Sequence, residues 1–207
     1  MNYKLLFEIS KFKAPPIFFT DRKKISDFEK IIKILPKNST IIIREYDLDK
    51  KKREDFARNI VNLARVKNRE KNLQIIVGKD FALARKIKAD GIHFSDFDKL
   101  PQSFLKKKSF PKKFIFSFAC HNFKSVLKAL KLRPNMIFIS PIFATTSHAE
   151  TKIIGLRNLR KISLISKKQN YLHNKIYALG GINSENIKSL RKLDISGFAG
   201  INLFKNL

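Results

Sequence analysis

Short apolar runs alternate along the chain with longer stretches in which apolar residues recur at helical spacing. Eight of the short runs are rich in β-branched and aromatic residues, and several are apolar almost throughout. These runs cover residues 16–20, 40–44, 73–78, 91–94, 114–119, 136–140, 175–181 and 197–202. Nearly continuous apolar runs of this length are typical of strands that are buried on both faces of a parallel sheet. The pattern therefore predicts eight parallel strands.

Helical patterns lie between these runs. The longest covers residues 50–70, where Phe56, Ile60, Leu63 and Ala64 share one face. Shorter helices are predicted over residues 82–87, 124–132 and 183–193, and residues 96–111 are expected to form a short helix with loops. The helix over 183–193 has Ser184 near its start and Gly181 just before it, which is a favourable helix entry.

Eight strands alternating with helices predict an α/β protein with a (β/α)₈ barrel, and a doubly wound open sheet is the alternative. No GxGxxG motif follows the first strand and no P-loop lysine motif is found, which disfavours the nucleotide-binding folds. We expect residues 1–207 to form one compact TIM-barrel domain. Its last helix should be truncated, because only five residues follow Asn202.

Charge is the most unusual feature of the composition. Lys and Arg number 44 and Asp and Glu 17, so the formal net charge is +27. The 33 Lys against 11 Arg, and 27 Ile against 4 Val, indicate a coding bias that raises the charge everywhere. The basic runs fall on different helices and loops without aromatic or Arg-rich interleaving, so we expect a solvated surface and no nucleic-acid partner.

The single cysteine, Cys120, excludes an intramolecular disulfide and favours a reducing compartment. No apolar run approaches the roughly 18 residues of a membrane-spanning helix. The apolar stretch at the start is too short and too often interrupted by charge for a signal peptide. We therefore expect a cytoplasmic protein without a membrane partner, and the sequence leaves its oligomeric state open.

The predicted strand ends carry Arg, Lys, His and hydroxyl side chains, which suit an anionic ligand. In a barrel, the chemistry lies at the carboxyl ends of the strands, and phosphate commonly binds after strands 7 and 8. There the segment ALGGIN places Gly180 and Gly181 between a strand and a helix start, where backbone N–H groups can approach an anion. A simple Gly-Gly turn is the alternative.

The strand-end motifs together resemble the thiamine phosphate synthase family, which includes the thiazole tautomerases. The resemblance runs from IFFTDR (17–22) through IREYD (43–47), KADGIHFSDFD (88–98), the Cys-His after strand 5, SPIFATTSH (140–148) and ALGGI (178–182) to GFAGIN (197–202). It implies a (β/α)₈ barrel that acts in thiamine biosynthesis. It also implies a transferase that joins hydroxymethylpyrimidine diphosphate to thiazole phosphate and releases diphosphate, with Mg²⁺ bound.

The resemblance also implies roles for individual residues. Arg44 matches an arginine that holds diphosphate, and Asp98 matches one of two aspartates that bind Mg²⁺. Ligand and phosphate binding would fall to residues of the last three strand ends, including the two hydroxyls of the PTxTK loop and the backbone cradle for the thiazole phosphate: Thr145, Ser147, His148, Gly180, Gly181, Ile201 and Asn202.

Several positions depart from the family pattern. The second Mg²⁺ aspartate is Lys79, the asparagine before it is Gly78, and the lysine of QLREK is Tyr46. The lysine of PTxTK is His148, although Lys152 is close enough in sequence to replace it. These changes make Mg²⁺ binding by Asp98 alone weak, and they suggest that Lys79 supplies part of the metal's charge at the diphosphate.

Two further hypotheses remain open. A tautomerase-like enzyme would use His121 for proton transfer without a metal, because the tautomerases keep a histidine there. Alternatively, the barrel binds a phosphorylated ligand or another protein without turnover. Each candidate also has a structural interpretation: a salt bridge of Arg44 with Glu45 or Asp47, a helix cap at Asp98, a structural role for His121, packing for Cys120 and a barrel-layer position for His93.

Overall fold

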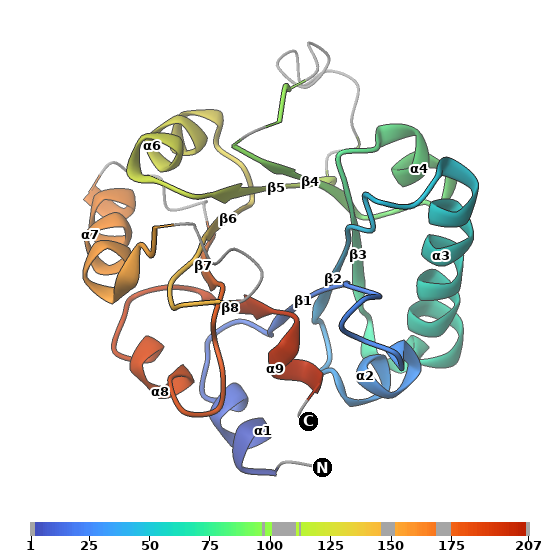
Figure 1. The fold of residues 1–207 in the computed structure, drawn as a ribbon, viewed down its shortest axis with the longest axis horizontal. Coiled ribbons are helices and arrows are strands. Elements are labelled where there is room, and N and C mark those ends of the chain that lie inside the picture. The colour runs from blue at the N-terminus through green and yellow to red at the C-terminus, as the bar shows by residue number, and fades with distance from the viewer. Residues whose placement is uncertain are drawn as a thin grey trace.

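Eight parallel strands close into a barrel with helices around it (Figure 1). The structure is a computed structural model, and it describes residues 3–96, 98–100, 111, 113–145, 152–168 and 175–205. Strand β1 pairs with β2 on one side and with β8 on the other, which closes the sheet. The predicted (β/α)₈ barrel is confirmed, and the doubly wound open sheet is wrong.

All eight predicted strands are present and pair in sequence order. They are β1 (Ile17–Phe19), β2 (Thr40–Ile43), β3 (Gln74–Gly78), β4 (Gly91–Ser95), β5 (Ile115–Cys120), β6 (Met136–Ile139), β7 (Lys175–Leu179) and β8 (Gly197–Gly200). Most end one or two residues from the predicted boundaries. The residues beyond these ends, among them Arg44, Lys79 and Gly180, leave the ladder and form the loops at one mouth of the barrel.

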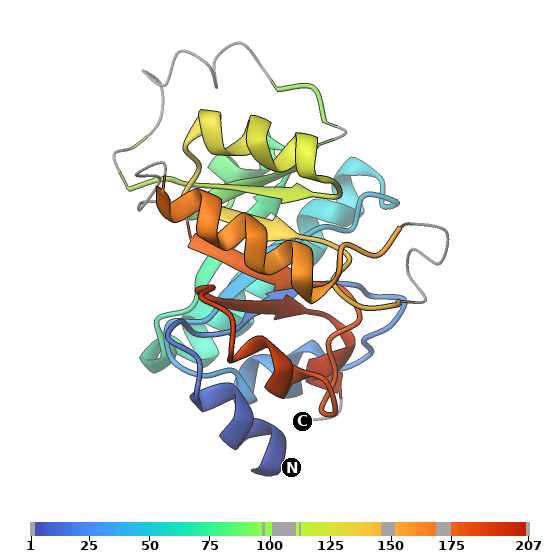
Figure 2. The same cartoon turned by 90° about the vertical axis from the view of Figure 1, so that its left-hand side faces the viewer.

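Helices cover the outside of the barrel, and α6, α7 and α8 lie side by side along one flank (Figure 2). Carboxylate or amide side chains cap the starts of α2, α3, α4 and α6: Asp27, Asp49, Asp80 and Asn122. The sequence pattern did not locate α1, α2 or α7. The helices described are α1 (Tyr3–Ser10), α2 (Phe28–Ile34), α3 (Lys50–Asn62), α4 (Phe81–Lys86), α6 (Phe123–Leu132), α7 (Gly155–Lys168), α8 (Ile187–Leu190) and α9 (Asn202–Lys205).

The helix predicted over residues 50–70 is regular only as far as Asn62. A π-helical turn (Leu63–Lys67) and a 3₁₀ turn (Arg69–Lys71) follow it. The buried side chain of Asn68 donates a hydrogen bond to the Leu63 carbonyl at 2.8 Å. A side-chain amide thus bonds a carbonyl at the helix end, and the regular α-helix ends earlier than the apolar pattern does.

The helix predicted over residues 183–193 is also shorter than expected, because α8 is a single turn. The side chain of Asn183 accepts hydrogen bonds from the backbone amides of Glu185 and Asn186, both at 3.0 Å. This side-chain turn replaces the first helical turn that Ser184 was expected to start. The last helix, α9, has four residues. Most of the expected helix and loops over residues 96–111 lie outside the described residues.

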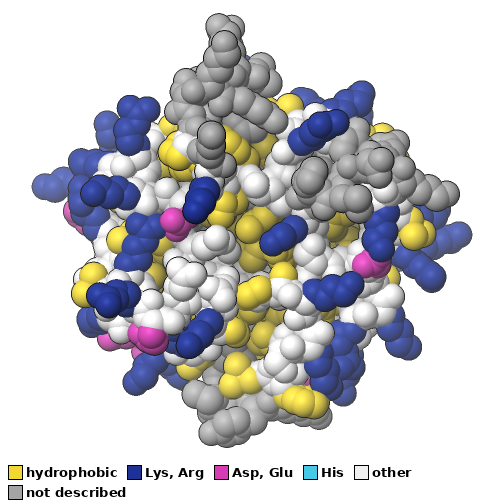
Figure 3. All heavy atoms as spheres, turned by 180° about the vertical axis from the view of Figure 1, so that it is seen from behind, with side chains coloured by type: hydrophobic (Ala, Val, Ile, Leu, Met, Phe, Trp, Pro, Cys, Tyr) yellow, Lys and Arg dark blue, Asp and Glu magenta, His cyan; other side chains and the backbone are white. Residues whose placement is uncertain are grey.

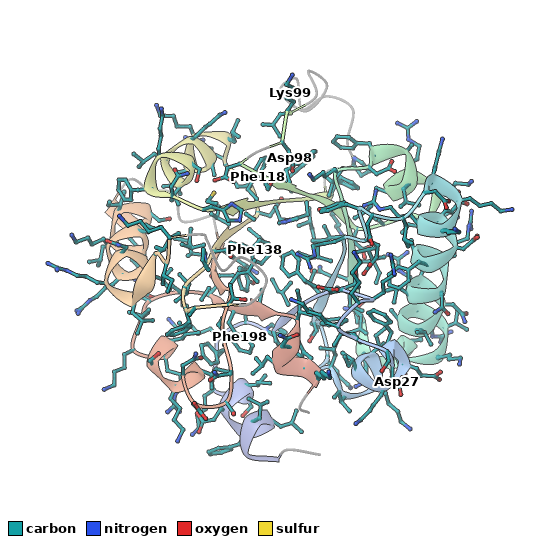
Figure 4. All side chains as sticks on the ribbon, in the orientation of Figure 1. Asp27, Asp98, Lys99, Phe118, Phe138 and Phe198 are labelled. Atoms are coloured by element: carbon teal, nitrogen blue, oxygen red, sulfur yellow. The ribbon has the colours of Figure 1, made fainter. Side chains whose placement is uncertain are left out.

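Two apolar layers hold the fold together. Alternate strand residues point into the barrel, where Phe19, Ile42, Phe138 and Tyr177 belong to one buried cluster. The other strand residues, such as Phe118 and Phe198, pack outward against the helices. In Figure 4, Phe138 lies inside the ring of strands. The strands are therefore buried on both faces, which explains their continuous apolar runs.

On the face shown in Figure 3, Lys and Arg side chains are scattered over the surface and do not form one patch. Several of them pair with acidic residues on neighbouring elements, as in Arg65–Asp90 and Lys67–Glu29. Within the described residues, no helix is both long enough and apolar enough to cross a bilayer.

Candidate active site

A pocket of about 260 Å³ opens among the carboxyl ends of β6, β7 and β8. Its lining brings together six predicted site residues that are far apart in the sequence: Arg44, Thr145, Gly180, Gly181, Ile201 and Asn202. Because all the strands are parallel, their carboxyl ends meet at one mouth, and this places the strand 2 arginine beside the glycine turn after strand 7. The pocket thus gathers several of the strand-end residues for which the sequence analysis predicted ligand binding.

The Gly180–Gly181 turn has a geometry that only glycine adopts easily. Both residues have positive φ, at 92° and 68°. A Cβ on Gly181 would lie 2.3 Å from the Ala144 carbonyl oxygen, and one on Gly180 would lie 2.9 Å from Pro141 Cα. The loop after β6 therefore packs directly on the turn after β7. The Asn186 side chain donates to the Gly181 carbonyl at 2.9 Å and holds the turn from the other side.

Arg44 reaches the pocket from the end of β2. Its Nε donates to the Thr20 carbonyl at 3.3 Å, and its Nη2 lies 3.5 Å from Asp21 Oδ2. Glu45 and Asp47, which were the expected alternative partners of Arg44, form ion pairs with Arg22 instead. The Arg44 side chain is 30% exposed, so its guanidinium contacts Thr20 and Asp21 and remains accessible at the mouth of the barrel.

Lys79 and Asp98 form an ion pair at the ends of β3 and β4. Lys79 Nζ lies 2.6 Å from Asp98 Oδ1. The second oxygen, Oδ2, accepts from the Ser95 backbone amide at 2.6 Å and from Ser95 Oγ at 3.0 Å. Asp98 lies just beyond β4 (Figure 4).

These contacts do not fit the Mg²⁺ ion that the family resemblance implies. Both oxygens of Asp98 already have partners, and one partner is a cation at the position of the second family ligand. Within the described part of the chain, no three His, Cys, Asp or Glu side chains are grouped so that they could hold a metal. The segment that Asp98 would cap lies mostly outside the described residues, so its interpretation as a helix cap stays a prediction.

Arg53, on α3, is a functional candidate that the sequence analysis missed. It is only 9% exposed, and its guanidinium donates to the Arg44 carbonyl at 2.9 Å and to the Gly78 carbonyl at 2.6 Å. It therefore joins the ends of β2 and β3, which carry Arg44 and Lys79. A lysine-rich helix start gave no sign that one of its cations points inward.

His121 is held by an aspartate that the sequence analysis also missed. Asp96 Oδ1 lies 2.7 Å from His121 Nδ1, and Asp96 Oδ2 accepts the His121 backbone amide at 2.9 Å. Burial would raise the pKa of Asp96, but the hydrogen bonds from His121 and Ser125 outweigh it and lower that pKa. An ionised Asp96 thus orients the ring, and Nε2 is the nitrogen that would exchange a proton.

His93 and Cys120 occupy structural positions. His93 lies inside the barrel, where its Nδ1 is 2.9 Å from Ser117 Oγ and its ring contacts Phe19 and Phe138. Burial, followed by the charge of Arg44, lowers the pKa of His93 to about 3. Burial also raises the pKa of the Cys120 thiol to about 12, so this residue packs as a neutral side chain.

The loop after β6 is described only in part. Thr145 lines the pocket, whereas Ser147 and His148 lie outside the described residues. Lys152, the expected substitute for the loop lysine, lines a separate hollow of about 430 Å³ together with His121 and residues of α6 and α7. The six residues around the glycine turn are thus brought together, while Lys152 and His121 face another pocket.

The comparisons with known proteins agree with this geometry. The family model described as "Thiamine monophosphate synthase" matches residues 17–204. This chain belongs to the thiamine monophosphate synthase family. It is 34% identical over 188 residues to an Aquifex aeolicus protein named "Putative thiamine-phosphate synthase 2", with 89% of this chain and 94% of that protein covered.

A further sequence relative agrees with this assignment, and a solved structure shares the fold. A thiamine-phosphate synthase of Clostridium tetani is 26% identical over 186 residues, covering 88% of this chain and 83% of that protein. A solved thiamine phosphate pyrophosphorylase from Pyrococcus furiosus matches the fold with a TM-score of 0.73 at 20% identity, covering 95% of this chain and 93% of that one. The family places the protein among transferases of thiamine biosynthesis that act on small phosphorylated substrates.

Proposed function

We propose that the protein forms thiamine phosphate from hydroxymethylpyrimidine diphosphate and thiazole phosphate. The thiazole nitrogen attacks the methylene carbon of the pyrimidine, the bond from that carbon to the diphosphate oxygen breaks, and diphosphate leaves. The observation that carries this proposal is the pocket that joins Arg44 to the glycine turn and the end of β8. One site thus places the backbone of a glycine turn next to a cation.

Each part of the site has a role in this reaction. The thiazole phosphate binds along the backbone of Gly181, Ile201 and Asn202, which fixes the attacking nitrogen. Arg44 faces the diphosphate and stabilises the negative charge that grows on it as the bond breaks. Thr20 and Asp21 hold the guanidinium in place before the substrate arrives, so little reorganisation is needed during the reaction.

Incubation of the protein with both substrates tests this function. Thiamine phosphate and diphosphate should appear in equal amounts, and Arg44→Ala should lower kcat/KM by roughly tenfold to a hundredfold, as expected for one charged hydrogen-bonding group. Arg58→Ala is the matched control, because Arg58 is an exposed arginine on the outer helix α3. Absence of diphosphate release by the natural protein would overturn the proposal.

The Asp96–His121 pair supports a second candidate, a tautomerase-like activity on a thiazole carboxylate phosphate. An imidazole that is oriented by a carboxylate can remove a proton from one ring position and return it at another. His121→Gln should abolish this exchange, and Asp96→Asn should reduce it and move its pH profile. Ligand binding without either reaction would instead identify a barrel that binds without turnover.

A further inference from the structure

Three side chains form an unusual corner beside Arg44, which we call the cationic corner: Tyr46, Lys79 and Asp98. Lys79 Nζ lies 4.7 Å from the centre of the Tyr46 ring and 2.6 Å from Asp98 Oδ1. The ammonium is therefore held between an aromatic face and a carboxylate, although the Lys79 side chain remains 44% exposed. It is fixed in position and still accessible to a ligand.

The backbone around Lys79 is built for this arrangement. Lys79 has a φ of 60°, which is uncommon for a residue with a side chain, and its amide donates to the His93 carbonyl at 2.9 Å. The Tyr46 ring fits only because residue 78 is glycine, since a Cβ there would lie 2.2 Å from the Tyr46 hydroxyl. The three departures Tyr46, Gly78 and Lys79 thus depend on one another, and together they place one cation at this corner.

A divalent cation does not suit the cationic corner. Asp98 would have to exchange the Lys79 ammonium for the metal, and its other oxygen would still be shared with Ser95. The displaced ammonium would remain nearby as a repelling charge. Arg44 and Tyr46 line one hollow at the barrel mouth, and Lys79 Nζ lies 4.7 Å from the centre of the Tyr46 ring, so both cations lie beside the same tyrosine.

We propose that Lys79 and Arg44 bind the diphosphate group directly and that the cationic corner works without a divalent cation. The inference rests on the proposed function, because it specifies how the leaving group is held in that reaction. Lys79 has three N–H donors and gives one to Asp98, so the others can serve phosphate oxygens. Asp98 acts as a positioning residue that aims the ammonium.

Binding of inorganic diphosphate to the full chain tests this inference without any turnover. In calorimetry, the natural protein should bind diphosphate in a buffer that contains EDTA, with no gain when Mg²⁺ replaces the chelator. Lys79→Ala should weaken binding roughly tenfold or more, as expected when a charged hydrogen-bond donor is lost. Lys128→Ala, which removes an exposed lysine from α6, should leave binding unchanged and controls for bulk charge.

The converse variant, Lys79→Asp, should gain metal-dependent binding, which would not be expected if Lys79 had only a structural role. Lys79→Asp places a second carboxylate near Asp98, so diphosphate binding should become weak in EDTA and recover with Mg²⁺. The same variant should bind Mn²⁺ detectably by electron paramagnetic resonance, whereas the natural protein should not. Thermal melting of each variant confirms that it is folded.

The outcomes separate this inference from the proposed function. Diphosphate binding by the natural protein that is lost in EDTA, or that is unchanged in Lys79→Ala, overturns the metal-free corner. Absence of diphosphate binding in both buffers also overturns it. Metal-free diphosphate binding without formation of thiamine phosphate would overturn the reaction and leave the corner intact, and turnover that requires Mg²⁺ would do the reverse.

Discussion

At the scale of single residues, the barrel interior determines how stability depends on pH. His93 has a pKa of about 3 in the folded protein and an ordinary value of 6.5. Between these values the unfolded chain binds a proton that the folded chain does not. The free energy of unfolding contributed by this residue is therefore complete above about pH 6.5 and is lost as the pH falls.

This linkage predicts how steeply the free energy of unfolding changes with pH, which urea denaturation can measure at several pH values between about 4 and 7. His93 should contribute up to about 1.4 kcal/mol of destabilisation per pH unit on acidification. His93→Gln should remove the pH-dependent contribution of His93 to the free energy of unfolding. The difference in this free energy between the natural protein and the variant should therefore shrink toward low pH. A difference that stays constant over this range would contradict the prediction.

The glycine turn provides a second prediction at this scale, with a matched control inside the chain. Gly155 and Gly181 have similar positive φ values, 74° and 68°, but a Cβ meets nothing within 4 Å at Gly155 and a carbonyl oxygen at 2.3 Å at Gly181. Gly155→Ala should cost about 1 kcal/mol from backbone conformation alone. Gly181→Ala should cost more and should also weaken binding of thiazole phosphate.

Calorimetry and urea denaturation of both variants separate the two effects. If Gly181→Ala bound thiazole phosphate like the natural protein, the turn would serve loop packing only. Gly180 and Gly181 would then form a simple turn between a strand and a helix, without a role in phosphate binding.

At the scale of elements, Arg53 connects a helix to two strand ends. Its guanidinium bonds the carbonyls of Arg44 and Gly78 and lies 3.5 Å from Asp80 Oδ2. Arg53→Met fills similar space but leaves these buried acceptors without their donors, so it should lower the free energy of unfolding by about 2–3 kcal/mol. It should also lower activity, because Arg44 and Lys79 lose their common support.

Arg58→Met on the same helix is the control for this prediction. Arg58 is 51% exposed and pairs with Glu54 one turn away, so its loss should change the free energy of unfolding by at most about 0.5 kcal/mol. Equal effects of the two variants in urea denaturation would show that Arg53 does not join the strands.

At the scale of the whole molecule, the net charge of +27 acts through self-repulsion. Most of the cations lie on different outer elements, so added salt should screen mainly like charges (Figure 3). We expect the melting temperature to rise between about 50 mM and 300 mM NaCl, where the Debye length shortens to several ångströms. A melting temperature that falls with salt would show that ion pairs such as Arg65–Asp90 outweigh the repulsion.

The strands were predictable because their signal is local and strong. A run such as Thr40–Ile43 is buried on both faces, and only a strand covered on each side tolerates four such residues in succession. Helices α2 and α7 were missed although their apolar residues recur at helical spacing, as Phe28, Ile31 and Ile32 do in α2. The ends of α3 and α8 were misjudged because Asn68 and Asn183 bond the backbone through their side chains, which an apolar pattern does not record.

The residues of the candidate site were likewise predictable only where they lie at strand ends. Residues at strand ends, such as Arg44 and Gly181, were found because a barrel gathers all carboxyl ends at one mouth. Asp96 and Arg53 were missed, since nothing local distinguishes one carboxylate after a strand, or one cation on a lysine-rich helix, from its neighbours. Their importance comes from contacts with His121 and Gly78, which lie 25 residues away in each case.

The sequence by itself determined the eight strands, the closed α/β architecture expected from them, the family and the set of polar strand ends. Each of these follows from local composition or from the order of motifs along the chain. Only the tertiary structure decided which polar groups are partners. It paired Lys79 with Asp98, His121 with Asp96 and Arg44 with Asp21, because contacts between different strand ends depend on how the barrel closes.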